Sequence, residues 1–118
     1  MQSVVMAVFP SPSDASIGLD NLSEANFGPA TISLVMRTTP EVADLANASG
    51  PLNGLPLDQL TEKLQGLGLS GKDAEEYRQG VLGGGVFISV SAPPGSESAA
   101  EEILKDANAR NVRVVLIR

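Results

Sequence analysis

Tyr77 is the side chain of this sequence that could most readily do chemistry, because it is the only tyrosine in a chain without histidine or cysteine. It stands beside Glu76, so a phenol and a carboxylate could act as an acid–base pair on a substrate. The spacing of Ala74, Tyr77 and Val81 instead places the ring on the apolar side of a helix, where a tyrosine commonly packs with its hydroxyl near water. We therefore expect Tyr77 to pack, and keep it as a possible ligand contact.

The amino-acid composition excludes most other kinds of catalytic or metal site. Without cysteine and histidine the chain lacks the usual ligands of zinc, haem and iron–sulfur clusters and every histidine-based general base. Carboxylates could still hold a hard cation, and Glu101, Glu102 and Asp106 lie close in sequence. Their helical spacing beside Lys105 favours a solvent-facing stripe. We expect no metal, no cofactor and no catalytic residue.

Charge and aromatic content limit the partners. The net charge of −6 disfavours binding to phosphate backbones and to anionic lipid, and an aromatic content of 3% leaves few rings on which bases could stack. We therefore expect no nucleic acid and no membrane as partners. The first ten residues lack a basic segment, and their apolar run is too short for a signal peptide, which predicts a cytoplasmic protein.

An internal repeat organises the chain. Shifted by 82 residues, the segment 4–36 lies over 86–118 without a gap, with identities at Val4/Val86, Val8/Val90, Pro12/Pro94, Leu22/Leu104, Ala25/Ala107, Asn26/Asn108 and Leu34/Leu116. Each copy opens with an alternating apolar strand pattern, continues as an amphipathic helix and ends in a second strand pattern. A single domain over 1–118 would comprise βαβ repeats at 4–37 and 86–118 around a helical middle at 38–85. This arrangement predicts an α+β, ferredoxin-like split βαβ sandwich with a four-stranded, mainly antiparallel sheet and helices on one face.

The second face of that sheet would be too apolar to leave in water. We expect Val4, Met6, Val8, Ile32, Leu34, Ile88, Val90, Val114 and Leu116 to face the helices of the repeats. The opposite face would then carry Val5, Ala7, Phe9, Val35, Phe87, Val115 and Ile117. Either the middle helices cover these seven residues or they form the interface of a homodimer, which is our leading expectation.

The middle segment has its own helix signals. Leu57, Leu60, Leu64 and Leu67 mark a short helix, Ser70 and Asp73 resemble a capping box for another, and one helical turn is predicted at 41–46. Three glycines, Gly83 to Gly85, then follow a helix and precede a strand, whereas phosphate-binding loops run from strand to helix. We expect the triplet to turn the chain, with Gly83 left-handed at the helix end.

Arg37 is the other candidate ligand contact. It ends the strand pattern of the first repeat, and a guanidinium there can bind a carboxylate with two hydrogen bonds, although strand-end arginines are usually solvated.

The stretch "GLGLSGKDAEEYRQGVLGGGVFISVSA", together with the N-terminal 4–37, resembles the general-stress, heat-induced stress protein domain of the YflT type, a family of small bacterial proteins of unknown function. The shared pattern is Gly-Leu-x-x-x-x-Ala-x-x-Tyr-x-x-Gly running into a Gly-Val strand. It falls here on Gly68, Leu69, Ala74, Tyr77, Gly80, Gly85 and Val86. The resemblance implies a strand–helix–strand start and a stress-related role, and brings no catalytic residues. This chain lacks the family's long glycine- and alanine-rich middle.

Three functions are compatible with these observations. The first is a non-enzymatic, stress-associated or regulatory homodimeric module that binds a protein or small metabolite. The second is a cofactor-independent enzyme of the dimeric α/β-barrel type, with Tyr77 and a carboxylate in a closed cavity between sheet and helices. The third is a small-metabolite-sensing domain.

Overall fold

The computed structural model describes residues 2–27, 31–36, 57–92 and 95–117. Its elements follow in the order β1 (Gln2–Phe9), α1 (Pro12–Glu24), β2 (Ile32–Met36), α2 (Leu57–Gly66), α3 (Gly71–Leu82), β3 (Val86–Ala92), α4 (Glu97–Asp106) and β4 (Arg110–Ile117). The helical turn predicted at 41–46 lies outside these ranges. None of the described helices is long and apolar enough to cross a membrane.

The four strands form one antiparallel sheet in the order β2-β3-β1-β4, so β1 and β3 are central, as a split βαβ sandwich requires. β1 and β2 flank β3, which makes each half of the chain a split βαβ unit of a ferredoxin-like sandwich. β4 lies at one edge of this sheet, and both α3 and α4 are packed near it.

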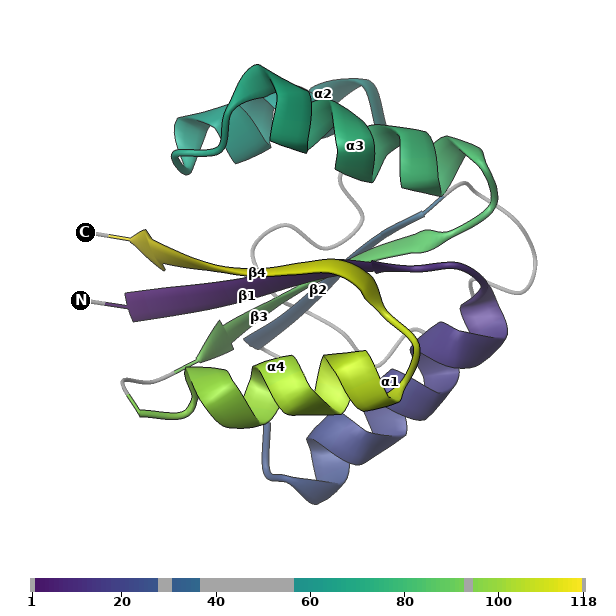
Figure 1. The fold of residues 1–118 in the computed structure, drawn as a ribbon, viewed down its shortest axis with the longest axis vertical. Helices are drawn as coiled ribbons and strands as arrows, with labels where there is room; N and C mark the ends of the chain where they lie inside the picture. Colours follow the sequence, from purple (N-terminus) through teal and green to yellow (C-terminus); the bar gives the residue numbers. More distant parts are fainter. Residues whose placement is uncertain (1, 28–30, 37–56, 93–94, 118) are drawn as a thin grey trace.

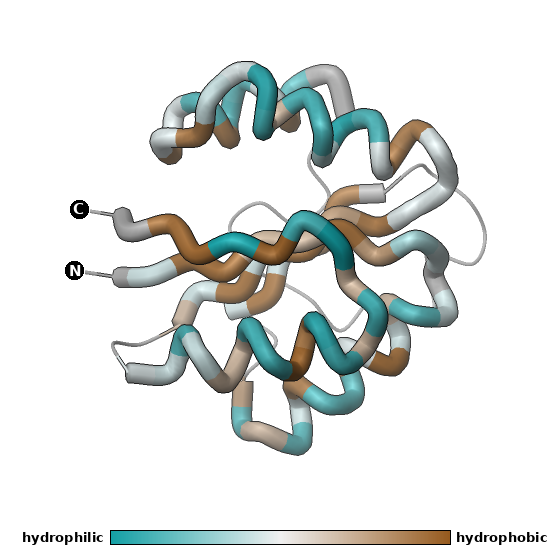
Figure 2. The backbone as a smooth tube through the Cα atoms, in the orientation of Figure 1, coloured by the Kyte–Doolittle hydropathy of each residue, from teal (hydrophilic) through white to brown (hydrophobic). Residues whose placement is uncertain are grey.

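Helices cover both faces of the sheet, which corrects the expectation of helices on one face only. α1 and α4 lie on one side and α2 and α3 on the other (Figure 1). Each layer closes its own apolar core, and hydrophobic residues are concentrated in the strands while the helices carry hydrophilic residues as well (Figure 2). The sequence left open whether the middle helices or a second subunit cover the second sheet face. Helices α2 and α3, from the middle of the chain, cover it.

The register of β1 on β3 corrects the predicted faces of β1. Val5 pairs with Val90 and Phe9 with Val86, and directly opposed residues of an antiparallel pair point to the same face. Val5, Ala7 and Phe9 therefore face α1 and α4, while Val4, Met6 and Val8 face α2 and α3. The shift of 82 misled because it aligns Val4 with Val86, and these two residues face opposite sides of the sheet.

The ends of α1 and α4 show that the internal repeat is preserved in the structure of these two helices. Asn26 and Asn108, identical in the repeat, both adopt positive φ (70° and 75°) directly after the alanines that cap α1 and α4. The next amide donates to the carbonyl five residues earlier, Phe27 to Leu22 and Ala109 to Leu104, which is the Schellman ending. The repeat therefore encodes the turn that returns each helix to the sheet.

Candidate functional site

Helix α3 places Tyr77 in the core between itself and the sheet. The helix begins where the Ser70 hydroxyl accepts a hydrogen bond from the Asp73 amide at 3.1 Å, which confirms the predicted cap. Ala74, Tyr77 and Val81 are its buried residues, so Tyr77 packs as predicted, but its hydroxyl is buried and not near water as expected. The Tyr77 ring meets the Phe87 ring edge-on, with centroids 5.2 Å apart and an interplanar angle of 73°.

The Tyr77 hydroxyl lies beside a bulge in edge strand β4. The β1–β4 pairing changes register between Met6, opposite Arg113, and Val8, opposite Arg110, so β4 has one extra residue there. Asn111, inside the bulge, has a φ of 55° and offers its carbonyl oxygen to the Tyr77 hydroxyl. The Met6 carbonyl oxygen is a second acceptor, 3.4 Å away.

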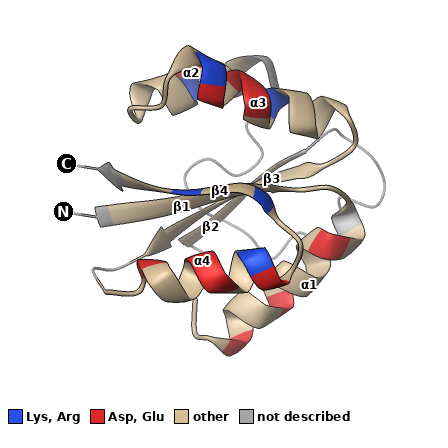
Figure 3. Cartoon of the chain, in the orientation of Figure 1, with Lys and Arg blue, Asp and Glu red and all other residues tan. Residues whose placement is uncertain are grey.

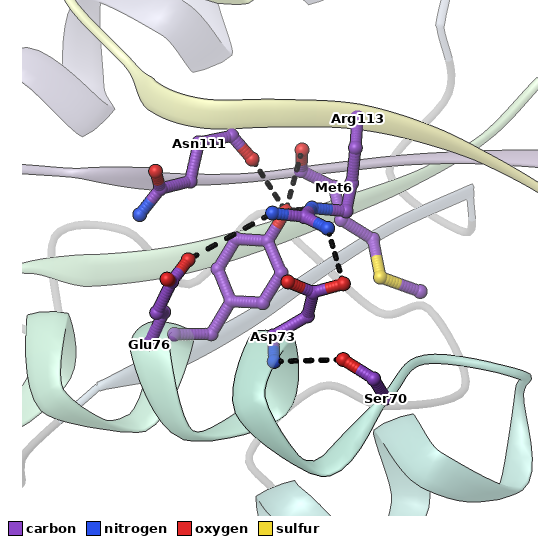
Figure 4. A network of polar contacts seen from close by, with 7 residues as sticks. Met6, Ser70, Asp73, Glu76, Asn111 and Arg113 are labelled. Atoms are coloured by element: carbon purple, nitrogen blue, oxygen red, sulfur yellow. Dashed lines mark hydrogen bonds and ion pairs between the residues drawn. The ribbon is translucent and has the colours of Figure 1, made fainter.

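Arg113 joins the same hydroxyl to the acidic residues of α3. Its Nε donates to the phenol oxygen at 3.0 Å, and its guanidinium lies 5.5 Å from the centre of the Tyr77 ring. One terminal nitrogen is 2.7 Å from a carboxylate oxygen of Asp73, and the other is 3.9 Å from one of Glu76. Figure 4 shows these groups converging between α3 and β4.

This environment holds Tyr77 in its protonated form. Burial raises the pKa of the phenol to about 12, and the nearby Arg113 offsets only part of that rise. A proton donor or acceptor working at neutral pH needs a pKa much closer to 7. The arrangement can therefore fix α3 to the sheet, and it is poorly suited to proton transfer.

A hollow of about 320 Å³ opens beside this network. One wall is α3 and the other is the start of β4, with the end of β1 between them. Its lining residues are Val8, Phe9, Pro10, Glu76, Gln79, Gly80, Gly83, Arg110 and Asn111. Glu76 and Arg110 bring opposite charges to it; basic residues on β4 and acidic residues on α3 are visible in Figure 3.

Gly80 lets α3 approach β1 beside the hollow. A Cβ atom at Gly80 would lie 2.8 Å from a methyl carbon of Val8, so a larger residue there would push α3 away from β1. Gly80 belongs to the pattern shared with the general-stress domain, and the closeness of Val8 explains the need for a small residue at this point of the helix.

The seven residues predicted to form an interface do not share one exposed face. Val5, Ala7 and Phe9 are buried under α1 and α4, whereas Val35 and Phe87 are buried under α2 and α3. Val115 is partly buried against the second group, and the side chain of Ile117 lies outside the description. Arg37, the other predicted ligand contact, also lies outside the described residues, so only Tyr77 of the predicted contacts is placed.

The acidic residues of α4 do not gather into a metal site. No group of three or more aspartate, glutamate, histidine or cysteine side chains in the described ranges has the geometry to hold an ion. Glu101 instead lies 3.7 Å from the Lys105 ammonium, as expected for a solvent-facing helical stripe.

Sequence reasoning missed the partners of Tyr77. Arg113 interrupts the apolar pattern of the strand 110–117, and an arginine at such a position signals a partner on the helix above it. Nothing in the sequence indicated the bulge at Asn111, because the positive φ of this residue follows from the register of β1 on β4. Arg110 and the hollow likewise depend on that register.

Comparison with known proteins found no matching family model, no matching curated protein and no matching solved structure. The resemblance to the general-stress domain therefore stays a prediction.

Proposed function

We propose that this protein is a non-catalytic regulatory module that binds a small polar ligand in the hollow between α3 and β4. The observation that carries the proposal is the placement of the hollow. Charged and amide side chains from two elements line it, and the Tyr77–Arg113–Asp73 network holds those elements together. Rigid walls with a few polar groups are typical of small-ligand sites.

The state of Tyr77 supports binding over catalysis. The enzyme alternative assigns the phenol to proton transfer, yet its hydroxyl is directed to the Asn111 carbonyl and its pKa is raised to about 12. An interior phenol with these partners stabilises the fold. The resemblance to the general-stress domain supports a stress-associated role for the module, and we include that role in the proposal.

A homodimer remains part of the proposal, with a different interface from the one first expected. Because helices cover both sheet faces, we place the contact at edge strand β4, whose outer backbone groups can pair with a second copy. Val114 on this strand is 39% exposed. Light scattering should give a dimer mass for the wild type and a monomer mass for folded Val114→Lys. Ile17→Lys, at another exposed apolar residue, is the control, and a monomeric wild type would contradict the dimer.

A thermal-shift screen tests the binding function. The panel contains amino acids, organic acids, sugar phosphates and nucleotides, each added to the wild type, to Arg110→Gln and to Arg78→Gln. A ligand that binds only the folded state raises Tm. We expect at least one class to stabilise the wild type and Arg78→Gln, and to stabilise Arg110→Gln less. A panel without effect, or an equal effect on all three proteins, would contradict the proposal.

A further inference from the structure

We infer that the hollow between α3 and β4 takes a free α-amino acid, recognised through both its carboxylate and its ammonium group. This inference rests on the proposed function, since it names the ligand class of the same site. It begins from the two opposite charges that line the hollow, Glu76 from α3 and Arg110 from β4.

In this proposal Arg110 binds the carboxylate group of the amino acid. It is the first residue of β4 and is exposed, and it makes no ion pair with any residue in the described ranges. By contrast, Arg78 and Arg113 both have carboxylate partners. A guanidinium can donate two parallel hydrogen bonds to one carboxylate, so Arg110 is suited to bind that end of the ligand.

In this proposal Glu76 accepts hydrogen bonds from the ammonium group of the amino acid. Its nearest cationic contact is the Arg113 guanidinium at 3.9 Å, which is longer than a hydrogen bond. The Asp73 carboxylate, at 2.7 Å, is the closer partner of that arginine. The Glu76 oxygens thus keep acceptor capacity for a ligand N–H group, and its side chain is 43% exposed and accessible from the hollow.

The pair of charges selects a zwitterion over a simple ion. A free anion would be attracted by Arg110 and repelled by Glu76, and the reverse holds for a free cation. The net charge of −6 further disfavours an anion such as a phosphate. An α-amino acid carries an ammonium group and a carboxylate on one carbon atom, so a single small ligand satisfies both residues.

The dimensions and the remaining lining agree with this ligand class. A volume of about 320 Å³ is at the small end of ligand sites. Gln79 and Asn111 add amide groups, while Val8, Phe9 and Pro10 add apolar surface beside them. We therefore expect a small amino acid with an apolar or amide side chain.

Isothermal titration calorimetry on the full chain tests the inference. The probes are glycine, L-alanine and L-glutamine, with N-acetylalanine and alanine amide as blocked analogues that each lack one charge. We expect at least one free amino acid to bind, and blocking either end to weaken binding by about tenfold or more. Arg110→Gln and Glu76→Gln should cause similar losses. Arg78→Gln and Glu62→Gln remove the same charges outside the hollow and should leave affinity unchanged.

Two results would overturn the inference, and they differ in what they say about the proposed function. If the amino acids fail to bind while another metabolite of the screen binds in an Arg110-dependent way, the ligand class is wrong and the site survives. If no metabolite binds in an Arg110-dependent way, the site fails as well. Equal affinity for L-alanine and its two blocked analogues would also overturn recognition of both charges.

Discussion

The Nε atom of Arg113 lies 3.0 Å from the phenol oxygen of Tyr77, and this contact ties edge strand β4 to helix α3. The two residues are far apart in sequence, and the arginine also pairs with Asp73 on the same helix. The contact thus joins the last strand of the chain to the helical layer that precedes β3. The same two elements, α3 and β4, line the hollow.

Removing the Tyr77 hydroxyl should destabilise the fold. Tyr77→Phe keeps the ring against Phe87 and leaves the Asn111 carbonyl and Arg113 Nε without their partner. We expect a loss of about 1–3 kcal/mol in the free energy of unfolding, measured by urea denaturation. Phe87→Tyr is not a suitable control because it adds a buried hydroxyl; Leu82→Met, at an exposed residue of the same helix, should change stability little. A Tyr77→Phe protein as stable as the wild type would contradict a structural role for the hydroxyl.

The phenol should titrate far above its ordinary range. Burial raises its pKa from 10.0 to about 12, so the neutral phenol is favoured in the folded state. The stability that this contributes is fully present below pH 10 and is lost as the pH rises towards 12. Because Tyr77 is the only tyrosine and the chain has no tryptophan, phenolate absorbance reports this residue alone. A native-state midpoint near that of the urea-unfolded chain would contradict the burial argument.

The Asp73–Arg113 pair should couple more strongly than an ordinary surface pair. Both side chains are about one-third exposed (32% and 31%), and their atoms approach to 2.7 Å. A double-mutant cycle with Asp73→Asn and Arg113→Gln should give a coupling of about 0.5–1 kcal/mol. The matched pair Glu75–Arg78, within one helix and more exposed, should couple more weakly. A coupling for Asp73–Arg113 no larger than that of the control would contradict its part in joining helix and strand.

The three glycines after α3 should respond differently to alanine. Gly83 has a φ of −79° and room for a Cβ, so Gly83→Ala should be neutral or stabilise by about 0.4–1 kcal/mol. Gly84 has a φ of 101°, and Gly84→Ala should cost about 1–2 kcal/mol. A Cβ at Gly85 would lie 2.4 Å from the Phe9 carbonyl oxygen, so Gly85→Ala should be the most damaging. Urea denaturation measures this order, and an equal effect at all three positions would contradict it.

This series also corrects the prediction for the end of α3. The glycines turn the chain from α3 into β3, but Gly84 adopts the left-handed conformation that had been assigned to Gly83. The Gly85 amide then donates to the Gly80 carbonyl, which completes a Schellman ending one residue later than expected. Helix ends are difficult to place from sequence to within one residue, because several small residues in a row fit the same turn.

The elements and the sheet order could be predicted from sequence because they depend on local patterns. Alternating valines, the Leu60–Leu64 spacing and the Ser70 cap each act within a few residues, and the repeat supplied the split βαβ order. The faces of β1 were predicted wrongly because they depend on pairing across the sheet, where a shift of one residue turns Val5 and Phe9 to the other side. The candidate site depends on the same pairing, since the bulge at Asn111 brings the strand to Tyr77.

The most direct test of the central claim is an amide NMR titration of the full chain with the metabolite that raises Tm most in the screen. We predict that the largest shifts fall on the residues around the hollow, among them Phe9, Gly80, Gly83 and Asn111, and that they disappear in Arg110→Gln. Shifts confined to the outer surfaces of α1 and α4 would contradict the account, because they would place the ligand on the opposite face of the sheet.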